Sequence, residues 1–414
     1  MGAQRRVVVT GIGAITPIGM TRDGLWDGIR RERSVVRALT RFDPSPFRSH
    51  LAAEVDDFVA LDHLEAKRAK RLDRFGQFSV IAARMALDDA ELDLARENRD
   101  RVGTSMGTAL GGVGYAEEQL GRYLAGGVSA VDPALALCVF GGAASCNVAI
   151  ELGIHGPNVT NGMSCASGTI AIGDGFRQIR DGYADVMICG GAEAPLAPLC
   201  YGAFAIIRAM STRNDDPTRA SRPFDAGRDG FVMAEGAAVM VLEDYGRAVA
   251  RGAHIYAEIL GVGTSSDAYH MTAPRPDGSQ AARAIQDALR EARVAPHEVG
   301  YINAHGSSTP LNDSTETHAL KTVFADHAYT IPVSGTKGYY GHALGASGAI
   351  EIAICALALE HDWLPPTLNL AAPDAACDLD YIPTTGRARR VDVLVSNSFG
   401  FGGINAAIVM GRAA

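Results

Sequence analysis

Residues 184–190, with the sequence ADVMICG, resemble residues 391–397, VDVLVSN. Each is a short β-prone run after a polar start, which is typical of a buried strand. Glycine turns then lead into a second apolar strand in both places, at residues 236–240 and 404–409. The repeat predicts two related α/β units that bury their strands between helices where they pack together.

No linker separates the two units. The segments near residues 215–217 and 274–278 contain proline or glycine and look like loops within a domain. We therefore expect a single domain over residues 1–414, with an N-terminal half of about 1–255 and a C-terminal half of about 256–414.

The composition indicates a globular protein with a large core. Of its 414 residues, 47% are hydrophobic and 21% are charged, which excludes disorder and low complexity. The apolar stretch from Val7 to Ile18 is interrupted by glycines and a proline and is too short to span a bilayer. We expect a cytoplasmic location with no membrane association.

Charge and cysteine content exclude other classes. The net charge of −9 argues against general binding to nucleic acid. The seven cysteines are odd in number and form no CxxC pair, which argues against a disulfide framework or structural zinc and for reduced thiols. A metal site is not expected, since no HExxH or paired Cys/His spacing occurs.

A locally basic segment stands out against the acidic total. Residues 67–90 have an apolar face at helical spacing, which predicts a helix. Its first turns carry Lys67, Arg68, Lys70, Arg71 and Arg74, although a helix N-terminus favours carboxylates. The cluster is either a binding surface or simply a solvated face.

Cys165 is the candidate nucleophile. It lies in residues 161–168, NGMSCASG, between a strand-like run and an amphipathic helix. The backbone N–H groups and dipole of a helix N-terminus favour a thiolate and predict a lowered pKa. A cysteine that merely packs in the core is the alternative.

Two histidines lie in turns of small residues. His305 is part of residues 303–309, NAHGSST, and His342 is part of residues 341–348, GHALGASG, with Lys337 five residues earlier. Imidazole suits proton chemistry near neutral pH, although a lone histidine is more often structural. Residues 103–107, GTSMG, match the G-x-S-x-G hydrolase pattern only formally, and Gly11 and Gly13 lack the third glycine of a dinucleotide fingerprint.

The order of Cys165, His305, Lys337, His342 and residues 399–403, FGFGG, resembles that of β-ketoacyl-acyl-carrier-protein synthases, above all the elongating synthase II type. The resemblance covers essentially the whole chain. It implies a thiolase fold, in which two pseudo-repeated α/β halves form α-β-α-β-α layers, and commonly a dimer.

The resemblance implies a decarboxylative Claisen condensation. Cys165 would carry the acyl group, and His305 and His342 would support decarboxylation of malonyl carrier. Lys337 would organise the histidines together with Glu351. The backbone N–H groups of Cys165 and Phe401 would form an oxyanion hole, within a gating loop made of Phe399, Gly400, Phe401, Gly402 and Gly403.

Binding residues follow from the same resemblance. Substrates would arrive on the phosphopantetheine arm of acyl carrier protein, with no tightly bound cofactor. Ser307 and Thr309 would contact the arm, and Leu110 and Phe204 would line the acyl pocket. The acidic carrier would dock on a set of basic residues: Lys67, Arg68, Lys70, Arg71, Arg208 and Arg213.

Departures from the family pattern leave the substrate open. Residues 135–142 lack the usual proline-containing pattern, Met163 departs from the usual small residues before the nucleophile, and Ile404 replaces a threonine. These changes fit a polyketide or polyene synthase as readily as fatty-acid elongation. A coenzyme A-dependent thiolase is the alternative enzyme, and a heterodimer with a chain-length factor is the alternative to a homodimer.

Overall fold

The main sheet of the protein joins two mirrored sets of strands. The computed structural model describes residues 4–413, and within them the strands follow the order β11-β10-β14-β15-β9-β1-β8-β7-β5-β6, with β2 beside β1. The strands are β1 (Val7–Thr16), β2 (Gly19–Met20), β5 (Val102–Gly107), β6 (Asn158–Asn161), β7 (Val186–Glu193), β8 (Gly236–Asp244), β9 (Ala257–Ser266), β10 (Tyr301–Asn303), β11 (Val333–Ser334), β14 (Val393–Gly400) and β15 (Ile404–Gly411).

Each half contributes five strands in the same spatial order. The set β6-β5-β7-β8-β1 mirrors the set β11-β10-β14-β15-β9, and the two sets meet where residues 7–9 of β1 pair antiparallel with residues 257–259 of β9. In both halves the outer three strands are parallel and the remaining pairs are antiparallel. The predicted repeat is confirmed, since residues 184–190 lead through β7 to β8 as residues 391–397 lead through β14 to β15.

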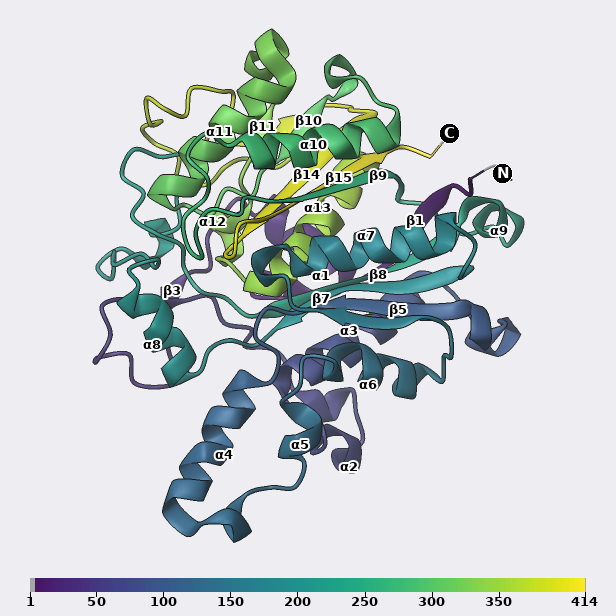
Figure 1. Cartoon of the computed structure of the whole chain (residues 1–414), viewed down its shortest axis with the longest axis vertical. Helices are drawn as coiled ribbons and strands as arrows, with labels where there is room; N and C mark the ends of the chain where they lie inside the picture. The colour runs from purple at the N-terminus through teal and green to yellow at the C-terminus, as the bar shows by residue number, and fades with distance from the viewer. Residues whose placement is uncertain (1–3, 414) are drawn as a thin grey trace.

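Helices form three layers around these strands (Figure 1). Helices α7 and α13 pack on each other between the two strand sets, whereas α3 and α6 cover the outside of one set and α10 and α11 cover the other. The thiolase-type α-β-α-β-α arrangement is confirmed. The helices are α1 (Thr21–Arg30), α2 (Ala66–Ala69), α3 (Arg74–Asp89), α4 (Val113–Gly126), α5 (Leu135–Cys138), α6 (Ala143–Leu152), α7 (Ser167–Arg180), α8 (Pro198–Ile206), α9 (Tyr245–Ala250), α10 (Ser279–Ala292), α11 (Pro310–Phe324), α12 (Lys337–Tyr340) and α13 (Ser347–His361).

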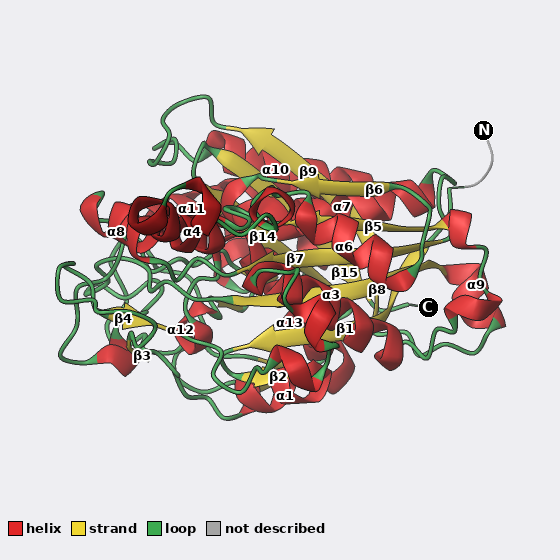
Figure 2. Ribbon diagram, turned by 90° about the horizontal axis from the view of Figure 1, so that it is seen from below, coloured by secondary structure: helices red, strands yellow, loops and turns green. Residues whose placement is uncertain are grey.

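Two small sheets lie apart from the main one. Strands β3 (Arg37–Ala38) and β4 (Leu51–Ala52) form one, and β12 (Trp363–Leu364) and β13 (Arg387–Ala388) form the other. Figure 2 shows that loops gather at one end of the layers, beside α8, α11 and α12. The mirrored halves thus bring their connecting segments to a common end.

The central helix α13 is apolar on all sides because it touches protein on all sides. The stretch Leu344–His361 is long and apolar enough to cross a membrane by composition, but 89% of it is buried inside the fold. A helix that is hydrophobic all round is expected in the core of a large protein. Its single interior acid, Glu351, is fully buried and therefore needs a partner.

The helix expected over residues 67–90 is wrong as a single element. The structure has a short helix, α2, and a separate helix, α3, that begins after Asp73. The Asp73 carboxylate accepts a hydrogen bond from the backbone N–H of Gly76 at 3.0 Å and so caps α3. Lys67, Arg68, Lys70 and Arg71 precede this cap, so they do not oppose the α3 dipole. Arg74 is the first residue of α3 and forms a salt bridge with Glu235 at 2.7 Å.

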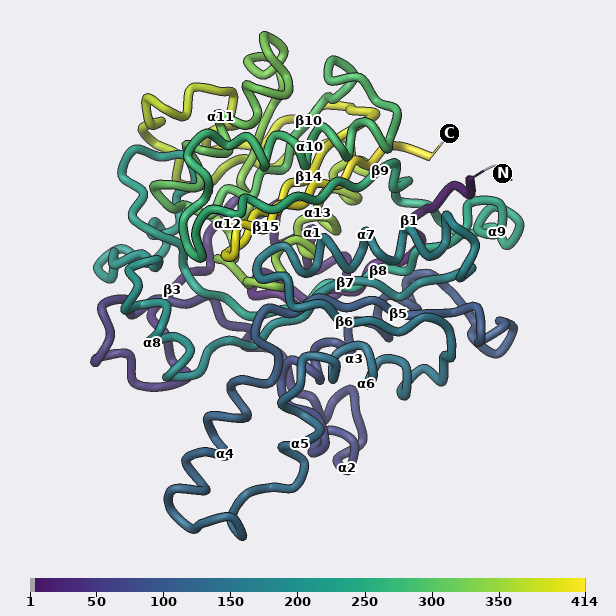
Figure 3. Tube along the Cα trace, in the orientation of Figure 1, coloured from purple at the N-terminus to yellow at the C-terminus, as the bar shows by residue number. Residues whose placement is uncertain are grey.

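Helices α4 and α5 form an arm that projects from the body (Figure 3). The arm exposes large apolar side chains, among them Leu124 at 75% and Val128 at 79%. Among the described strands, β6 pairs only with β5, and its Val159 is 44% exposed. Exposed apolar side chains and an unpaired strand edge are both features of interaction surfaces.

We expect Gly348→Ala to destabilise the fold, because α7 and α13 approach too closely for a Cβ atom. At Gly348 such an atom would lie 2.0 Å from Thr169 Oγ1 and 2.7 Å from Ser398 Oγ. Overpacking of this kind lowers the free energy of unfolding by about 1–3 kcal/mol, which denaturant titration would measure. Gly121→Ala is the control, since nothing lies within 4 Å of that position. Equal midpoints for the two variants would contradict the prediction.

Candidate active site

Segments from both halves converge on one pocket. Cys165 follows β6, His305 follows β10, and residues 399–403 join β14 to β15. Carboxyl ends of neighbouring parallel strands lie at the same edge of a sheet, where clefts of α/β proteins form. His342 reaches the same place from the turn between α12 and α13.

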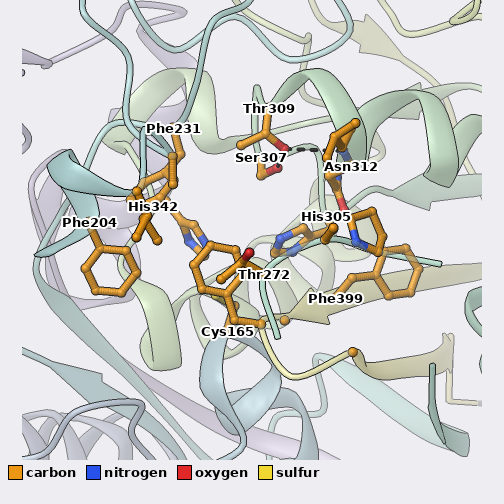
Figure 4. Close-up of a pocket in the computed structure, with 18 of the residues that line it drawn as sticks. Cys165, Phe204, Phe231, Thr272, His305, Ser307, Thr309, Asn312, His342 and Phe399 are labelled. Atoms are coloured by element: carbon orange, nitrogen blue, oxygen red, sulfur yellow. Dashed lines mark hydrogen bonds between the residues drawn. The ribbon is translucent and has the colours of Figure 1, made fainter. Parts of the chain in front are cut away.

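The pocket has a volume of about 320 Å³ and is lined by Cys165, His305 and His342. Figure 4 shows both imidazoles beside the space above Cys165. The two rings lie 5.3 Å apart between centroids with their planes at 79°. The structure thus brings together the candidate nucleophile, Cys165, and both histidines that the sequence singled out.

Cys165 occupies a strained turn at the start of α7. The preceding residue, Ser164, has φ +53°, which is unusual for a residue other than glycine. Burial raises the pKa of the Cys165 thiol to about 11, although the Lys337 charge and the Phe401 backbone N–H act to lower it. The prediction of a lowered pKa is therefore wrong, because desolvation outweighs these favourable partners.

Lys337 holds His305 from the far side of the pocket. Its ammonium group donates to the His305 carbonyl oxygen at 2.5 Å and to His305 Nδ1 at 3.4 Å. A ring nitrogen that accepts leaves the proton on the other nitrogen, so Nε2 of His305 carries the proton. Burial and the Lys337 charge hold the His305 pKa well below 6.5, so the ring is neutral.

Glu351 receives the third Lys337 hydrogen bond. The two side chains form a salt bridge, and both are fully buried. Burial raises the Glu351 pKa to about 7, and Lys337 opposes that rise. A buried charge left without its partner is strongly destabilising, so each of the two groups depends on the other.

His342 is held by helix α13. Its Nδ1 and the Ser347 hydroxyl are 2.7 Å apart and share a hydrogen bond. Phe231 packs edge-on against the ring at 5.3 Å between centroids. Burial and the Lys337 charge hold the His342 pKa well below 6.5. Both imidazoles are therefore neutral hydrogen-bonding groups.

Sequence reasoning missed Glu316, which shapes the His305 turn. The Glu316 carboxylate accepts the backbone N–H groups of His305 at 2.8 Å and Gly306 at 2.9 Å. Asn397 of β14 donates to the same carboxylate at 3.2 Å. An acid inside a helix so soon after His305 was a usable signal, but only the fold shows that it faces inward.

Sequence reasoning also missed Glu193. Its carboxylate binds the turn that follows β5, which is the counterpart of the His305 turn that follows β10. Glu193 is the last residue of β7 and accepts backbone N–H groups from Ala109 at 2.5 Å, Leu110 at 3.1 Å and Gly345 at 3.0 Å. The sequence signal that could have identified Glu193 was an acidic residue at the end of an apolar, strand-like segment.

The turns at Cys165 and Gly345 are related by the internal repeat. Each has a positive φ just before it, at Ser164 (+53°) and Leu344 (+42°), and each is followed by Ala-Ser-Gly at a helix start. A Cβ atom at Gly345 would lie 2.6 Å from Glu193 Oε2. In the other half Gly400 occupies the place of Glu193, so no carboxylate from that place reaches the Cys165 turn.

The loop of residues 399–403 closes one side of the pocket. Phe399 is buried, and Phe401 stacks on Phe204 at 6.0 Å between ring centroids. Gly402 and Gly403 have φ of +86° and +72°, a region that favours glycine. The Gly402 N–H donates to the Met271 carbonyl at 2.7 Å, so this loop is tied to a second loop.

The expected binding hydroxyls also reach the pocket. Ser307 and Thr309 line it, and their hydroxyl oxygens lie 2.8 Å apart. Phe204 lines it too. Leu110 packs in the same hydrophobic cluster as Cys165 and Phe204 but is not among the lining residues. Within residues 4–413, no group of three or more His, Cys, Asp or Glu side chains could hold a metal ion.

The six expected docking residues do not form one patch. Arg208 lines the pocket, whereas Arg213 is half-buried and donates to the Gly227 carbonyl at 3.3 Å. Lys67, Lys70 and Arg71 are exposed, and Arg68 pairs with Glu151 of α6 at 3.3 Å. Figure 1 places α2 beside α5 at the bottom of the molecule, whereas α8 lies at the left.

Comparison with known proteins gives consistent matches over the whole chain. Residues 4–248 match the beta-ketoacyl synthase N-terminal domain, and residues 256–371 match the C-terminal domain of the same family. A 3-oxoacyl-[acyl-carrier-protein] synthase 2 of Synechocystis is 50% identical over 402 residues, 97% of each chain. The tetracenomycin polyketide synthase ketoacyl synthase alpha subunit of Streptomyces glaucescens is 45% identical, over 99% of this chain and 98% of that one.

Solved structures agree with this result. A ketosynthase of a type II polyketide system, bound to its acyl-carrier protein and a hexaketide, superposes with a TM-score of 0.93 at 37% identity, over 99% of this chain and 100% of that one. The ishigamide ketosynthase/chain length factor gives 0.92 at 37% identity, with all of both chains covered.

We expect His305 and His342 to stay neutral from about pH 6 to 8, since their pKa values lie well below 6.5. NMR of ring-labelled histidine would measure this. The paired substitution Lys337→Met with Glu351→Gln removes a nearby positive charge and should therefore raise the His305 pKa. The pKa should still remain below 6.5, because burial lowers it more than the Lys337 charge does. Protonation of either ring near pH 6.5 in the native protein would refute this account.

Proposed function

Because the chain belongs to the β-ketoacyl synthase family, we propose that it elongates an acyl chain held on acyl carrier protein by decarboxylative condensation with malonyl carrier. It is an acyltransferase-class condensing enzyme of fatty-acid or type II polyketide synthesis. The observation that carries this proposal is the pocket in which Cys165, His305 and His342 face one another over the Lys337 support.

Loading begins with attack of the Cys165 sulfur on the acyl thioester carbonyl. The carbon–sulfur bond to the arm breaks, and the proton released by the thiol goes to the leaving pantetheine thiolate. The negative oxygen of the intermediate would be bound by the backbone N–H groups of Cys165 and Phe401. Gly400 supports this assignment, because it leaves room where the repeat-related position carries Glu193.

Condensation would use the two neutral imidazoles as donors. We propose that Nε2–H of His305 and of His342 bind the thioester oxygen of malonyl carrier, where enolate charge develops as carbon dioxide leaves. The resulting carbanion attacks the acyl-Cys165 carbonyl, and the Cys165 thiolate departs. The product is a β-ketoacyl carrier two carbons longer. The Ser347 hydroxyl would donate to Nδ1 of His342 and so keep its proton on Nε2.

The surrounding residues take supporting roles in this proposal. Lys337 and Glu351 orient His305. The loop made of Phe399, Gly400, Phe401, Gly402 and Gly403 would open and close the pocket between the two steps. Ser307 and Thr309 would contact the pantetheine arm. Phe204 and Leu110 would contact the acyl chain, Leu110 from behind the lining layer. No tightly bound cofactor is required, since the carrier brings the reactive thioester.

We also propose that the chain acts as one domain, with halves 1–255 and 256–414, in a homodimer in the cytoplasm. The mirrored strand order and two family matches that meet near residue 255 support the halves. The exposed apolar arm and the edge strand β6 support the dimer. A heterodimer with a chain-length factor is the second candidate, favoured by the similarity to the tetracenomycin alpha subunit and the ishigamide pair.

We expect Cys165→Ala to abolish acyl loading, because within residues 4–413 no other cysteine lines the pocket that holds both histidines. Intact-mass spectrometry after incubation with a panel of acyl carriers would detect the adduct in the native protein only. Loading from coenzyme A alone would favour the thiolase-type reaction, and loading only after addition of a chain-length factor would favour the heterodimer. Full turnover by Cys165→Ala would contradict the proposed mechanism.

We expect His305→Ala and His342→Ala to retain loading but to lose condensation by at least about a hundredfold, the usual effect of removing an oxyanion donor. Single-turnover release of carbon dioxide from malonyl carrier would measure the step. Normal decarboxylation by either variant would remove that histidine from the proposed role.

The exposed cations Lys67, Lys70 and Arg71, in α2 and just after it, should guide the acidic carrier by long-range attraction. We expect Lys67→Glu with Arg71→Glu to raise the KM for carrier substrates several-fold at low salt, with little change in kcat and a smaller effect at high salt. Arg96→Glu with Arg290→Glu makes the same change in net charge at two other exposed sites and serves as the control. If the two double substitutions gave the same KM, the result would contradict a role for residues 67–71 in carrier docking.

A further inference from the structure

Helix α8 forms one wall of the active-site pocket. Phe204 in the helix and Ile207 just after it line the pocket, and Figure 4 shows the Phe204 ring on the same side as His342. Phe204 stacks on Phe401 at 6.0 Å between ring centroids and meets Phe231 edge-on at 5.9 Å. The position of α8 therefore decides where Phe204 lies in the wall of the pocket.

The N-terminus of α8 has no capping side chain of its own. The residue before the helix is Ala197, whose side chain makes no hydrogen bond, and the first helical residue is Pro198, which has no N–H group. Serine, threonine, aspartate or asparagine is preferred at the cap position. The N–H groups of Leu199 and Cys200 therefore need acceptors from another segment.

Glu117 supplies this cap from helix α4. Its carboxylate accepts the Leu199 N–H at Oε2 and the Cys200 N–H at Oε1, each at 2.8 Å. A carboxylate at a helix N-terminus also interacts favourably with the helix dipole. Within residues 4–413 Glu117 takes part in no salt bridge, so its carboxylate serves the helix and not an ion pair.

Two contacts fix the direction of the α8 axis. Figure 1 shows α8 beside the end of α4 that joins the body, where Glu117 holds the first turn of α8. In the middle of α8, the Tyr201 hydroxyl donates to the Leu51 carbonyl at 2.9 Å and accepts from the Leu51 N–H at 3.0 Å. A helix held at a single point is free to tilt, so the Glu117 contact completes the support of this wall.

We propose that Glu117 is a positioning residue for acyl-chain binding, which acts through the cap of α8 on Phe204. The inference rests on the proposed function, in which Phe204 contacts the acyl chain. With only the Tyr201 anchor left, α8 would tilt and Phe204 would leave its place on Phe401. Long acyl chains would then bind less well, whereas the chemistry at Cys165 would be unchanged.

The test measures how an alkyl chain binds beside Cys165 without any carrier. Rate constants for alkylation by iodoacetamide and by N-octyl iodoacetamide are followed by intact mass, with Cys165→Ala as the blank for other thiols. In both reagents the sulfur displaces iodide from the same carbon, so the ratio of the octyl to the unsubstituted rate constant reports binding of the alkyl chain. We expect a native ratio of at least about ten, because burial of each CH₂ group is favourable.

Glu117→Gln keeps the size of the side chain but removes its charge and one of its two acceptor oxygens. We expect it to lower the ratio roughly threefold to tenfold, the range that loss of one helix cap allows, while the iodoacetamide rate constant stays at the native value. Glu118→Gln is the matched control on the same helix. The Glu118 carboxylate is exposed and pairs with Arg122 at 2.6 Å, so this variant should keep the native ratio.

Adding Ala197→Ser to Glu117→Gln tests the capping itself. A serine here would offer its hydroxyl to the same N–H groups from within the chain of α8, and the extended backbone at this position (φ −129°, ψ 145°) suits a cap residue. We expect the ratio to recover in part. A ratio that does not recover would overturn the proposal. So would a lower melting temperature of Glu117→Gln with an unchanged ratio, because Glu117 would then act on stability alone.

Acyl carriers separate this proposal from the proposed function. With carrier substrates, Glu117→Gln should raise the KM for long acyl chains with little change in kcat. A native alkylation ratio near one, together with normal loading from long acyl carriers, would overturn the role of Glu117 and leave the proposed function intact. If the native enzyme loaded from no acyl carrier but the alkylation ratios changed as expected, the proposed function would fail and the role of Glu117 in alkyl-chain binding would be supported.

Discussion

The three hydrogen bonds of the buried Lys337 ammonium tie the active site to the core. They reach Glu351 in the middle of α13 and both the carbonyl and the ring of His305 after β10. An ammonium group without these partners could not be buried in so apolar a place. The site therefore depends on a contact between the central helix layer and one strand set. The same contact adds to the larger effect of burial in lowering the His305 pKa, and it leaves the ring proton on Nε2.

The internal repeat explains why the molecule has one active site and not two. Both halves build a turn with a positive φ that enters a central helix through Ala-Ser-Gly. At one turn Gly345 packs against Glu193, whose carboxylate accepts the Gly345 N–H. In the other half Cys165 takes the place of glycine and Gly400 takes the place of the acid. The combination of Cys165 with Gly400 leaves the Cys165 side chain and backbone N–H donors available to a substrate.

Desolvation sets the electrostatics of the pocket. It keeps both imidazoles neutral, and it raises the pKa of the Cys165 thiol despite the nearby positive charge. Neutral imidazoles can donate to a developing enolate without giving up a proton, which suits a step that creates charge in a dry site. The loop of residues 399–403 is joined to residue 271 by a backbone hydrogen bond, so exposure of the site to water involves both loops together.

The sequence alone determined the fold and the chemical centre. Buried strands have a recognisable composition, so the similarity of residues 184–190 and 391–397 indicated two related α/β units. The resemblance of the ordered motifs to a known family then implied their thiolase arrangement. Cys165, His305, Lys337 and His342 lie in short motifs of small residues whose order along the chain is specific. Glu351 was identified through the family resemblance, as a group organised by Lys337.

Only the tertiary structure decided what depends on contacts between distant segments. The break between α2 and α3 follows from the Asp73 cap, which competes with a continuous helix that the apolar periodicity favours. Glu193 and Glu316 bind backbone groups that come from other elements, so nothing in their local sequence identifies them. The pKa of the Cys165 thiol depends on burial and on charges that lie nearby only in the folded chain, and neither is encoded in any single stretch of the sequence.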